Sequence, residues 1–360
     1  FEKLGSEKMA KYKCIYCLTE KDESAFNREH VVPRMMGTYN NGFVLGNHQV
    51  CEECNSYFSK ELENKIGLDS YEAFLRMQYG NKRMSDGRIL QNKRIALTGN
   101  EGIFKGLKFT VVSDSSKQER VHFDISPCIG ISKVGSQDEY DYYSLDNLPQ
   151  ATEETLSHLK EKPHGIISVD LKREDVEQAL KDKGYLSDSY TYSEPEIASM
   201  YGKTDFSTAI RISIDSIMRR VCAKTVFNYL CFSEGSDYVL QSKFDELRKY
   251  IRYGIWSNNL WFRYSQEPVS TAQLPTPTSH CVGYMFFPQN GCWNMCGCLT
   301  WFGQLTYIFK LGVTDIPITR FNVLPPTKMA YFDNDTKNIS EESAVFVYGG
   351  RPDDQYHFKK

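Results

Sequence analysis

Two C-x-x-C pairs near the start of the chain constrain its fold more than any other feature. Cys14 and Cys17 form the first pair, and Cys51 and Cys54 form the second. Each pair brings two sulfur atoms to one side of a tight turn, so two pairs can complete a tetrahedral shell of four thiolates around zinc. We therefore expect a closed structural zinc site. Because a closed site leaves no position for a substrate, any chemistry needs other residues.

The segment between the two pairs carries its own candidate chemistry. It contains E-H-V-V-P at residues 29–33 and then Asn47, and Asn55 directly follows the last cysteine. This order resembles the HNH endonuclease family, in particular its variant with zinc knuckles. The resemblance covers about residues 10–66. It implies a ββα-metal fold, in which a hairpin strand delivers a histidine and the following helix delivers a metal ligand.

The resemblance also implies a role for each residue of the motif. His30 would be the general base that activates water, while Glu29 and Asn55 would bind a divalent ion. Asn47 would hold the hairpin and orient the histidine. Many members of the family place a histidine at the third motif position on the helix, where this chain offers Ser59, Lys60 or Glu63.

These residue types suit phosphodiester hydrolysis. A histidine with a pKa of about 6.5 can deprotonate water near neutral pH, and a divalent cation can stabilise charge on the leaving oxygen. Carboxylate and amide oxygens favour Mg²⁺ or Mn²⁺, whereas thiolates favour zinc. The alternative is a zinc knuckle that only binds nucleic acid, with structural roles for Glu29 and His30. Because a zinc knuckle alone does not require a Glu-His pair, we favour hydrolysis.

Composition indicates a soluble globular protein with room for two or three domains. The chain has 360 residues, of which 41% are hydrophobic and 25% charged. Residues 1–13 are polar, unlike a signal peptide, and no apolar run reaches the length of about eighteen residues expected of a membrane span. We therefore expect a cytoplasmic protein without a membrane segment.

The remaining cysteines and His48 have simpler interpretations. Eleven cysteines, four of them assigned to zinc, fit a reducing compartment. We interpret Cys128, Cys222 and Cys231 as small apolar residues. The group Cys292, Cys296 and Cys298 lacks C-x-x-C spacing, so buried core residues are favoured over a second metal site. His48 is expected in a surface loop.

A net charge of −3 means that any contact with phosphates must come from a local basic patch. Residues 76–108 carry such a patch directly after the HNH-like segment, with only Asp86 and Glu101 as acids. The candidate nucleic-acid contacts are Arg76, Lys82, Arg83, Arg88, Lys93 and Arg94. A phosphate track and an ordinary solvated face are equally good interpretations of this run.

The rest of the chain predicts an α+β fold. Period-two runs predict strands at 107–112, 121–125, 129–134, 166–169, 316–323 and 344–348, and a hairpin within 280–311 that turns at 288–291. Helical periodicity predicts helices at 173–183, from about 207 to 232, and at 244–254 with Gly254 at the end. Residues 188–204 are interpreted as a loop or subdomain boundary.

These patterns predict three parts. Residues 1–75 form a zinc-stabilised HNH module, 76–108 a basic connector, and 109–360 a larger α+β domain with two prominent helices and a C-terminal antiparallel sheet, which could divide near 188–204. The larger part has no phosphate loop and no G-x-S-x-G motif. Its basic-faced helices and the strand that begins near Ser279 resemble the C-terminal part of bacterial HNH proteins, and this resemblance implies a domain for target recognition, regulation or partner docking.

By resemblance, the whole chain is expected to be a metal-dependent HNH endonuclease that cuts DNA, as a bacterial defence or restriction-type effector. A regulatory protein such as a short Argonaute, a small-molecule activator and a second copy of the chain are left open as partners.

Overall fold

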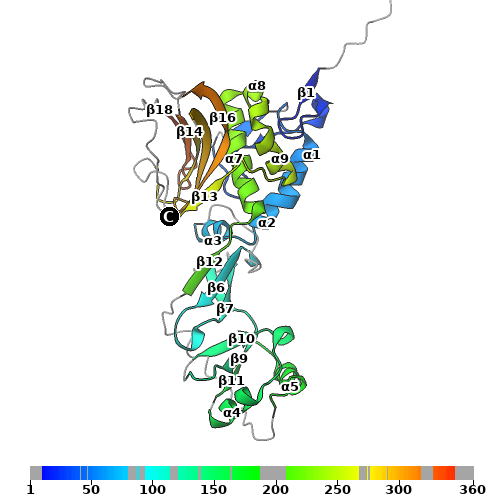
Figure 1. Cartoon of the computed structure of the whole chain (residues 1–360), viewed down its shortest axis with the longest axis vertical. Coiled ribbons are helices and arrows are strands. Elements are labelled where there is room, and N and C mark those ends of the chain that lie inside the picture. The colour runs from blue at the N-terminus through cyan, green and yellow to red at the C-terminus, as the bar shows by residue number, and fades with distance from the viewer. Residues whose placement is uncertain are drawn as a thin grey trace, which may run out of the picture. The chain divides into compact units, whose positions relative to one another are not determined.

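The structure is a computed structural model of the chain, shown in Figure 1. It describes residues 10–40, 42–46, 48–79, 87–88, 94–113, 121–136, 139–162, 164–186, 208–266, 274, 276–289, 291–317 and 327–344. The chain forms two compact units. Unit 1 comprises Phe1–Leu68, Glu72–Arg83 and Ile214–Lys360, and unit 2 comprises Asp69–Tyr71 and Met84–Ser213. Unit 1 thus combines the N-terminal segment with the last part of the chain. The predicted domains 1–75, 76–108 and 109–360 are each continuous in sequence, and this division stays a prediction.

The ββα order expected of the N-terminal segment is present in unit 1. Strand β3 pairs antiparallel with β4, and helix α1 follows. The elements of this segment are β1 (Lys11–Lys13), β2 (Glu20–Asp22), β3 (Glu29–His30), β4 (Val44–Leu45), α1 (Glu52–Tyr57), the π-helical turn η2 (Phe58–Glu63), α2 (Asn64–Ile66) and α3 (Tyr71–Gln78).

An antiparallel sheet of six strands, in the order β13-β16-β15-β14-β17-β18, forms the second layer of unit 1 (Figure 1). Its strands are β13 (Phe262–Ser265), β14 (His280–Gln289), β15 (Cys292–Trp301), β16 (Leu305–Pro317), β17 (Thr327–Phe332) and β18 (Ile339–Ala344). The predicted C-terminal antiparallel sheet is confirmed. The predicted hairpin within 280–311 contains three strands, not two, because the chain turns again at Gly303, whose φ of 64° favours glycine. Of the other strands predicted here, residues 318–323 and 345–348 lie outside the described residues.

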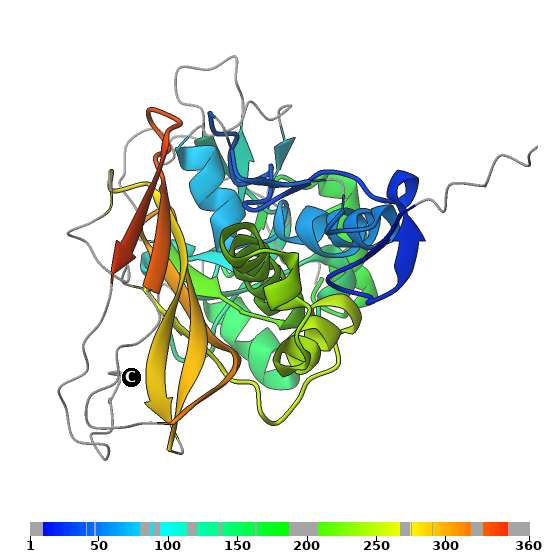
Figure 2. The same ribbon diagram turned by 90° about the horizontal axis from the view of Figure 1, so that it is seen from above.

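Helix α7 (Ser216–Glu234) connects the two layers of unit 1. The Asp215 side chain caps it by accepting a hydrogen bond of 2.9 Å from the backbone N–H of Met218. The helix contacts β14 and β15 on one side and β4 and η2 on the other, and Figure 2 shows it between the sheet and the N-terminal segment. Most of its residues are therefore buried, including polar ones.

The predicted helix from about 207 to 232 is wrong at its start. Residues Thr208–Ile212 form strand β12, because T-A-I-R-I alternates with period two and pairs with β6 (Ile95–Gly99). The predicted helix at 244–254 is confirmed as α9 (Asp245–Tyr253), which ends at Gly254 with a left-handed φ of 74°. The short helix α8 (Ser236–Val239) lies between α7 and α9. None of the helices in the described part of the chain is long and apolar enough to cross a membrane.

In its described residues, unit 2 contains two sheets and two α-helices. One sheet has the order β12-β6-β7-β5, with β8 also paired to β7, and the other has the order β10-β9-β11. The elements are β5 (Gly87–Arg88), β6 (Ile95–Gly99), β7 (Lys108–Ser113), β8 (Val121–Ile125), β9 (Cys128–Ser132), β10 (Tyr140–Tyr143), α4 (Glu153–Glu161), β11 (Ile166–Val169), α5 (Arg173–Asp182) and β12.

The sequence predicted much of unit 2 correctly. The strands predicted at 107–112, 121–125, 129–134 and 166–169 and the helix at 173–183 are confirmed within one or two residues. A core of Ile129, Ile131, Leu159, Val176 and Leu180 joins the smaller sheet to α4 and α5. The predicted boundary at 188–204 lies outside the described residues.

Candidate active site and metal centre

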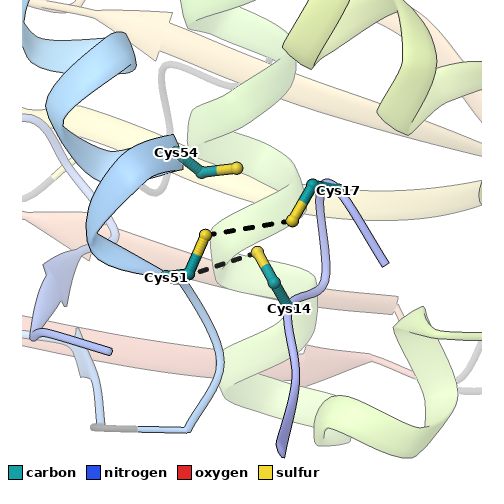
Figure 3. Close-up of side chains that lie close together, drawn as sticks. All are labelled: Cys14, Cys17, Cys51 and Cys54. Carbon is teal, nitrogen blue, oxygen red and sulfur yellow. Dashed lines mark hydrogen bonds between the residues drawn. The ribbon is translucent and has the colours of Figure 1, made fainter. Parts of the chain in front are cut away.

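The four cysteines of the C-x-x-C pairs converge. Their sulfur atoms all lie within 4.8 Å of one another, and Figure 3 shows them facing a common centre. The sulfur atoms of Cys17 and Cys51 are 3.9 Å apart, and no disulfide joins them. In a tetrahedral shell with zinc–sulfur bonds of about 2.3 Å, neighbouring sulfurs lie about 3.8 Å apart. The spacing therefore fits a structural zinc ion.

Helix α9 contributes a cation to the surroundings of this cluster. Arg252 donates from Nε to the sulfur of Cys54 at 3.3 Å and from a terminal nitrogen to Glu53 at 3.2 Å. Hydrogen bonds to ligand atoms orient them and stabilise their charged form. The four-cysteine cluster is thus formed by the N-terminal segment and is also contacted by helix α9, about two hundred residues later in the sequence.

Strand β3 separates the two residues of the Glu-His pair. Because successive side chains of a strand point to opposite faces, Glu29 is buried towards α7 while His30 remains half-buried at the other face. In the antiparallel pairing of β3 with β4, Glu29 lies opposite Leu45 and His30 lies opposite Val44.

His30 lines a pocket of about 240 Å³. Other lining residues are Arg28, Arg34, Tyr39, Phe43 and Phe332. Both arginines are exposed, so the pocket presents positive charge beside the histidine. An anionic phosphate group suits such a lining.

The same surroundings control the protonation of His30. Burial lowers the pKa of His30 below its usual 6.5, and the positive charges of Arg34, Lys224 and Arg28 lower it further. The imidazole is therefore neutral at pH 7 and can accept a proton.

Asn55 ties helix α1 to the segment that precedes β3. Its amide nitrogen donates to the side-chain oxygen of Asn27 at 2.7 Å and to the carbonyl oxygen of Arg28 at 3.1 Å. The second expected asparagine, Asn47, lies outside the described residues. His48, expected in a surface loop, stacks on Tyr12 with ring centroids 4.0 Å apart.

Helix α7 supplies two polar side chains that contact the Glu-His strand. Lys224 donates to the carboxylates of Glu29 and Glu63, and its distance to Glu63 is 2.7 Å. One turn later, Asn228 donates to Glu29 at 3.2 Å and to the carbonyl oxygen of His30 at 3.1 Å. Of the three candidates for the third motif position, Glu63 is the one that shares a partner with Glu29. Ser59 is half-buried and Lys60 is exposed.

The arrangement around Glu29 does not fit the expected divalent ion. One carboxylate oxygen of Glu29 already accepts hydrogen bonds from Lys224 and Asn228, and the residue is 6% exposed. Mg²⁺ and Mn²⁺ usually keep several waters and need open oxygen ligands. Within the described ranges, the four cysteines are the one group of three or more acids, histidines or cysteines that converges on a metal position.

The expected basic track is described only in part. Arg76 is buried and donates to the carbonyl oxygens of Met35 and Gly67, at 3.1 and 2.7 Å. Arg94 is buried in unit 2 and pairs with Asp69 at 3.1 Å. Burial removes both arginines from an exposed phosphate track. Lys82, Arg83 and Lys93, and the side chain of Arg88, lie outside what the structure describes.

Six of the other cysteines were predicted to be core residues, and five of these six are buried. Cys128, Cys222 and Cys231 are buried. In the candidate second metal group, Cys296 and Cys298 are buried in β15 and Cys292 is half-buried.

Four residues of the site were given no site role from the sequence. Arg28 and Arg34 flank the motif in R-E-H-V-V-P-R, and a search for positive charge beside the motif would have found them. Lys224 and Asn228 lie one turn apart in a helix whose buried residues are mostly apolar. Polar residues with helical spacing on a buried face signal a buried polar contact.

Comparison with known proteins agrees with this geometry. Residues 14–69 match the family model described as HNH endonuclease, which spans the four cysteines, the Glu-His pair and Asn55. The resemblance predicted from the motif is confirmed for this segment. No curated protein and no solved structure matches the chain.

Proposed function

We propose that the chain is a metal-dependent endonuclease that hydrolyses phosphodiester bonds of DNA. The observation that carries the proposal is that His30 lines a pocket together with two exposed arginines, and that all three residues belong to the segment that matches the HNH endonuclease model. Neutral imidazole, positive charge and an accessible cavity are what hydrolysis of a phosphodiester requires at one place.

Each side chain of the pocket has a separate task in this proposal. His30 removes a proton from the attacking water, and Arg28 and Arg34 contact the phosphate oxygens. The dependence on a divalent ion, Mg²⁺ or Mn²⁺, rests on the family match, and such an ion would stabilise charge on the leaving oxygen when bound.

The parts of the chain outside residues 14–69 have a different proposed role. The described residues that line the His30 pocket belong to unit 1. The proposed task of unit 2 is target recognition or control of the nuclease, as the sequence resemblance implies for a bacterial defence or restriction-type effector. A regulatory protein, a small-molecule activator and a second copy of the chain are candidates for the controlling partner.

Plasmid cleavage tests the proposal. The zinc-loaded chain should nick or linearise supercoiled DNA with Mg²⁺ or Mn²⁺, and chelation by EDTA should stop the reaction. His30→Ala should abolish cleavage, whereas His48→Ala, a matched change of a partly exposed histidine in the same segment, should not. A folded protein that binds DNA without cutting it under any of these conditions would support the nucleic-acid-binding alternative.

A further inference from the structure

Lys224 is a buried cation that lies between two carboxylates. Its side chain is fully buried on α7, and its ammonium group donates to Glu29 and, at 2.7 Å, to Glu63. The Glu29 and Glu63 side chains are 7% and 17% exposed. Three ionisable groups from β3, η2 and α7 thus meet away from solvent.

The charges of this group compensate one another. A buried ammonium is costly unless carboxylates pair with it and satisfy its hydrogen bonds. Burial alone lowers the pKa of Lys224, but the charges and hydrogen bonds of Glu29 and Glu63 overcome this effect and raise the pKa overall. Lys224 is therefore charged at neutral pH. The ring of Phe58, 5.6 Å from its nitrogen, adds a cation–π contact.

Asn228 connects Glu29, and so the buried group of Lys224, Glu29 and Glu63, to the proposed base His30. It donates to Glu29 and to the His30 carbonyl, and its own oxygen accepts a hydrogen bond of 2.5 Å from Tyr16. Lys224 and Asn228 therefore hold the Glu-His strand from the side opposite the pocket.

We infer that the ammonium of Lys224 is the resident cation of the Glu29–Glu63 carboxylate pair, and that Glu29 positions the His30 strand instead of holding the divalent ion of the nuclease reaction. The inference concerns the site of the proposed function and relies on that function only for the role of His30.

Electrostatic repulsion argues against a site in which Lys224 and a divalent ion share the Glu29–Glu63 carboxylates. An ammonium and a divalent ion on the same carboxylate would repel each other strongly in a buried environment. The lysine also satisfies the carboxylates without the coordinated waters that Mg²⁺ retains. Removal of the ammonium should leave two carboxylates with oxygen ligands suited to a divalent ion.

Binding of Mn²⁺ to the zinc-loaded full chain, measured by electron paramagnetic resonance, provides the first test. Glu29→Gln keeps Lys224 paired with Glu63 and should change Mn²⁺ affinity by less than about twofold, far below the tenfold that marks a loss of 1.4 kcal/mol. The concentration of Mn²⁺ that half-saturates plasmid cleavage should be equally unchanged. A folded Glu29→Gln protein in which either value weakens more than about tenfold would overturn the inference.

Lys224→Met provides the second test. It should lower the melting temperature more than Lys65→Met, the matched change in the exposed Lys65–Glu61 pair, because only the buried change leaves carboxylates uncompensated. Saturating Mn²⁺ should raise the melting temperature of Lys224→Met by occupying the vacated position, and Lys224→Met with Glu63→Gln should lose this effect. A Lys224→Met protein that melts like wild type and ignores Mn²⁺ would contradict the inference.

The two tests remain informative if one variant fails. If Lys224→Met does not fold, the Glu29→Gln titration decides. If the wild-type chain cuts no DNA, the proposed function fails, while Mn²⁺ binding and melting still decide which cation the carboxylate pair holds.

Discussion

The side-chain amide of Asn228 donates a hydrogen bond of 3.1 Å to the backbone carbonyl oxygen of His30. This bond connects helix α7 to the strand that carries the proposed base. The orientation of the base therefore depends on a helix far away in the sequence, and the segment that matches the HNH model is packed into unit 1, not appended to it.

Zinc should be necessary for the N-terminal segment to fold. We expect one tightly bound zinc per chain, and loss of structure in this segment on Cys14→Ser, Cys17→Ser, Cys51→Ser or Cys54→Ser. Zinc binding to such small sites supplies about 10 kcal/mol or more, which is comparable to the whole stability of a domain. Elemental analysis of protein purified without chelator measures the zinc, and circular dichroism measures the structure. Protein without zinc that keeps its native spectrum would refute the assignment, and Cys128→Ser serves as the control outside the cluster.

Arg28 and Arg34 should contact DNA phosphates. The double change Arg28→Ala with Arg34→Ala should weaken DNA binding similarly for all sequences, because phosphate contacts carry no base information. The slope of log affinity against log salt should become shallower by about 0.9 for each phosphate that an arginine no longer neutralises. Fluorescence anisotropy at several salt concentrations measures this slope. An unchanged slope would show that neither arginine contacts a phosphate.

Arg94 should matter for stability and not for DNA binding. Its pair with Asp69 is buried, with side chains 7% and 8% exposed. Removing one partner of a buried pair typically costs about 3–5 kcal/mol, so Arg94→Ala should destabilise unit 2 by an amount of this order. Arg173→Ala, which breaks the exposed pair with Glu177, should cost about 1 kcal/mol or less. Chemical denaturation compares the two variants, and equal effects would contradict the burial argument.

His280 should make unit 1 sensitive to acid. Its ring accepts a hydrogen bond of 3.0 Å from the N–H of Phe302, its other nitrogen lies 3.1 Å from the carbonyl oxygen of Met36, and burial lowers its pKa from 6.5 to about 3. Only the unfolded state binds the proton between these values. The stability contributed by neutral His280 is therefore complete above pH 6.5 and decreases as the pH falls towards 3, by about 1.4 kcal/mol per pH unit.

Urea unfolding followed by tryptophan fluorescence can measure this dependence, since Trp301 lies against the His280 ring at 4.9 Å. Replacing the histidine by His280→Gln should reduce the slope of stability against pH between 6.5 and 4. Identical slopes for the two proteins would show that the pKa of His280 does not differ between the folded and unfolded states as proposed.

The sequence was most informative where chemistry depends on local spacing. The C-x-x-C pairs predicted the four-cysteine cluster, and the order of Glu29, His30 and Asn55 predicted the segment that matches the HNH model. Both patterns lie within a short stretch, and the geometry of a turn or a hairpin limits what they can form.

Contacts between distant segments were not predictable in the same way. Nothing in the spacing of Lys224 reveals that it meets Glu29, because the packing of α7 against β4 and η2 brings them together. The error at Thr208–Ile212 has a similar cause. Ile210 has helical spacing to Ile214 and Ile217 but also alternates with Ile212, and pairing with β6 favours the strand.

The central claim, that His30 is the general base of a phosphodiester hydrolase, is tested most directly by the single-turnover rate of plasmid cleavage as a function of pH. With the pKa of His30 lowered below 6.5, the wild-type rate should be insensitive to pH near neutrality and decline only at more acidic pH. His30→Ala should keep its zinc and DNA affinity, cut about two to four orders of magnitude more slowly, and lack the acidic decline. A folded His30→Ala protein that cuts at the wild-type rate, or that shows the same acidic decline, would contradict the account.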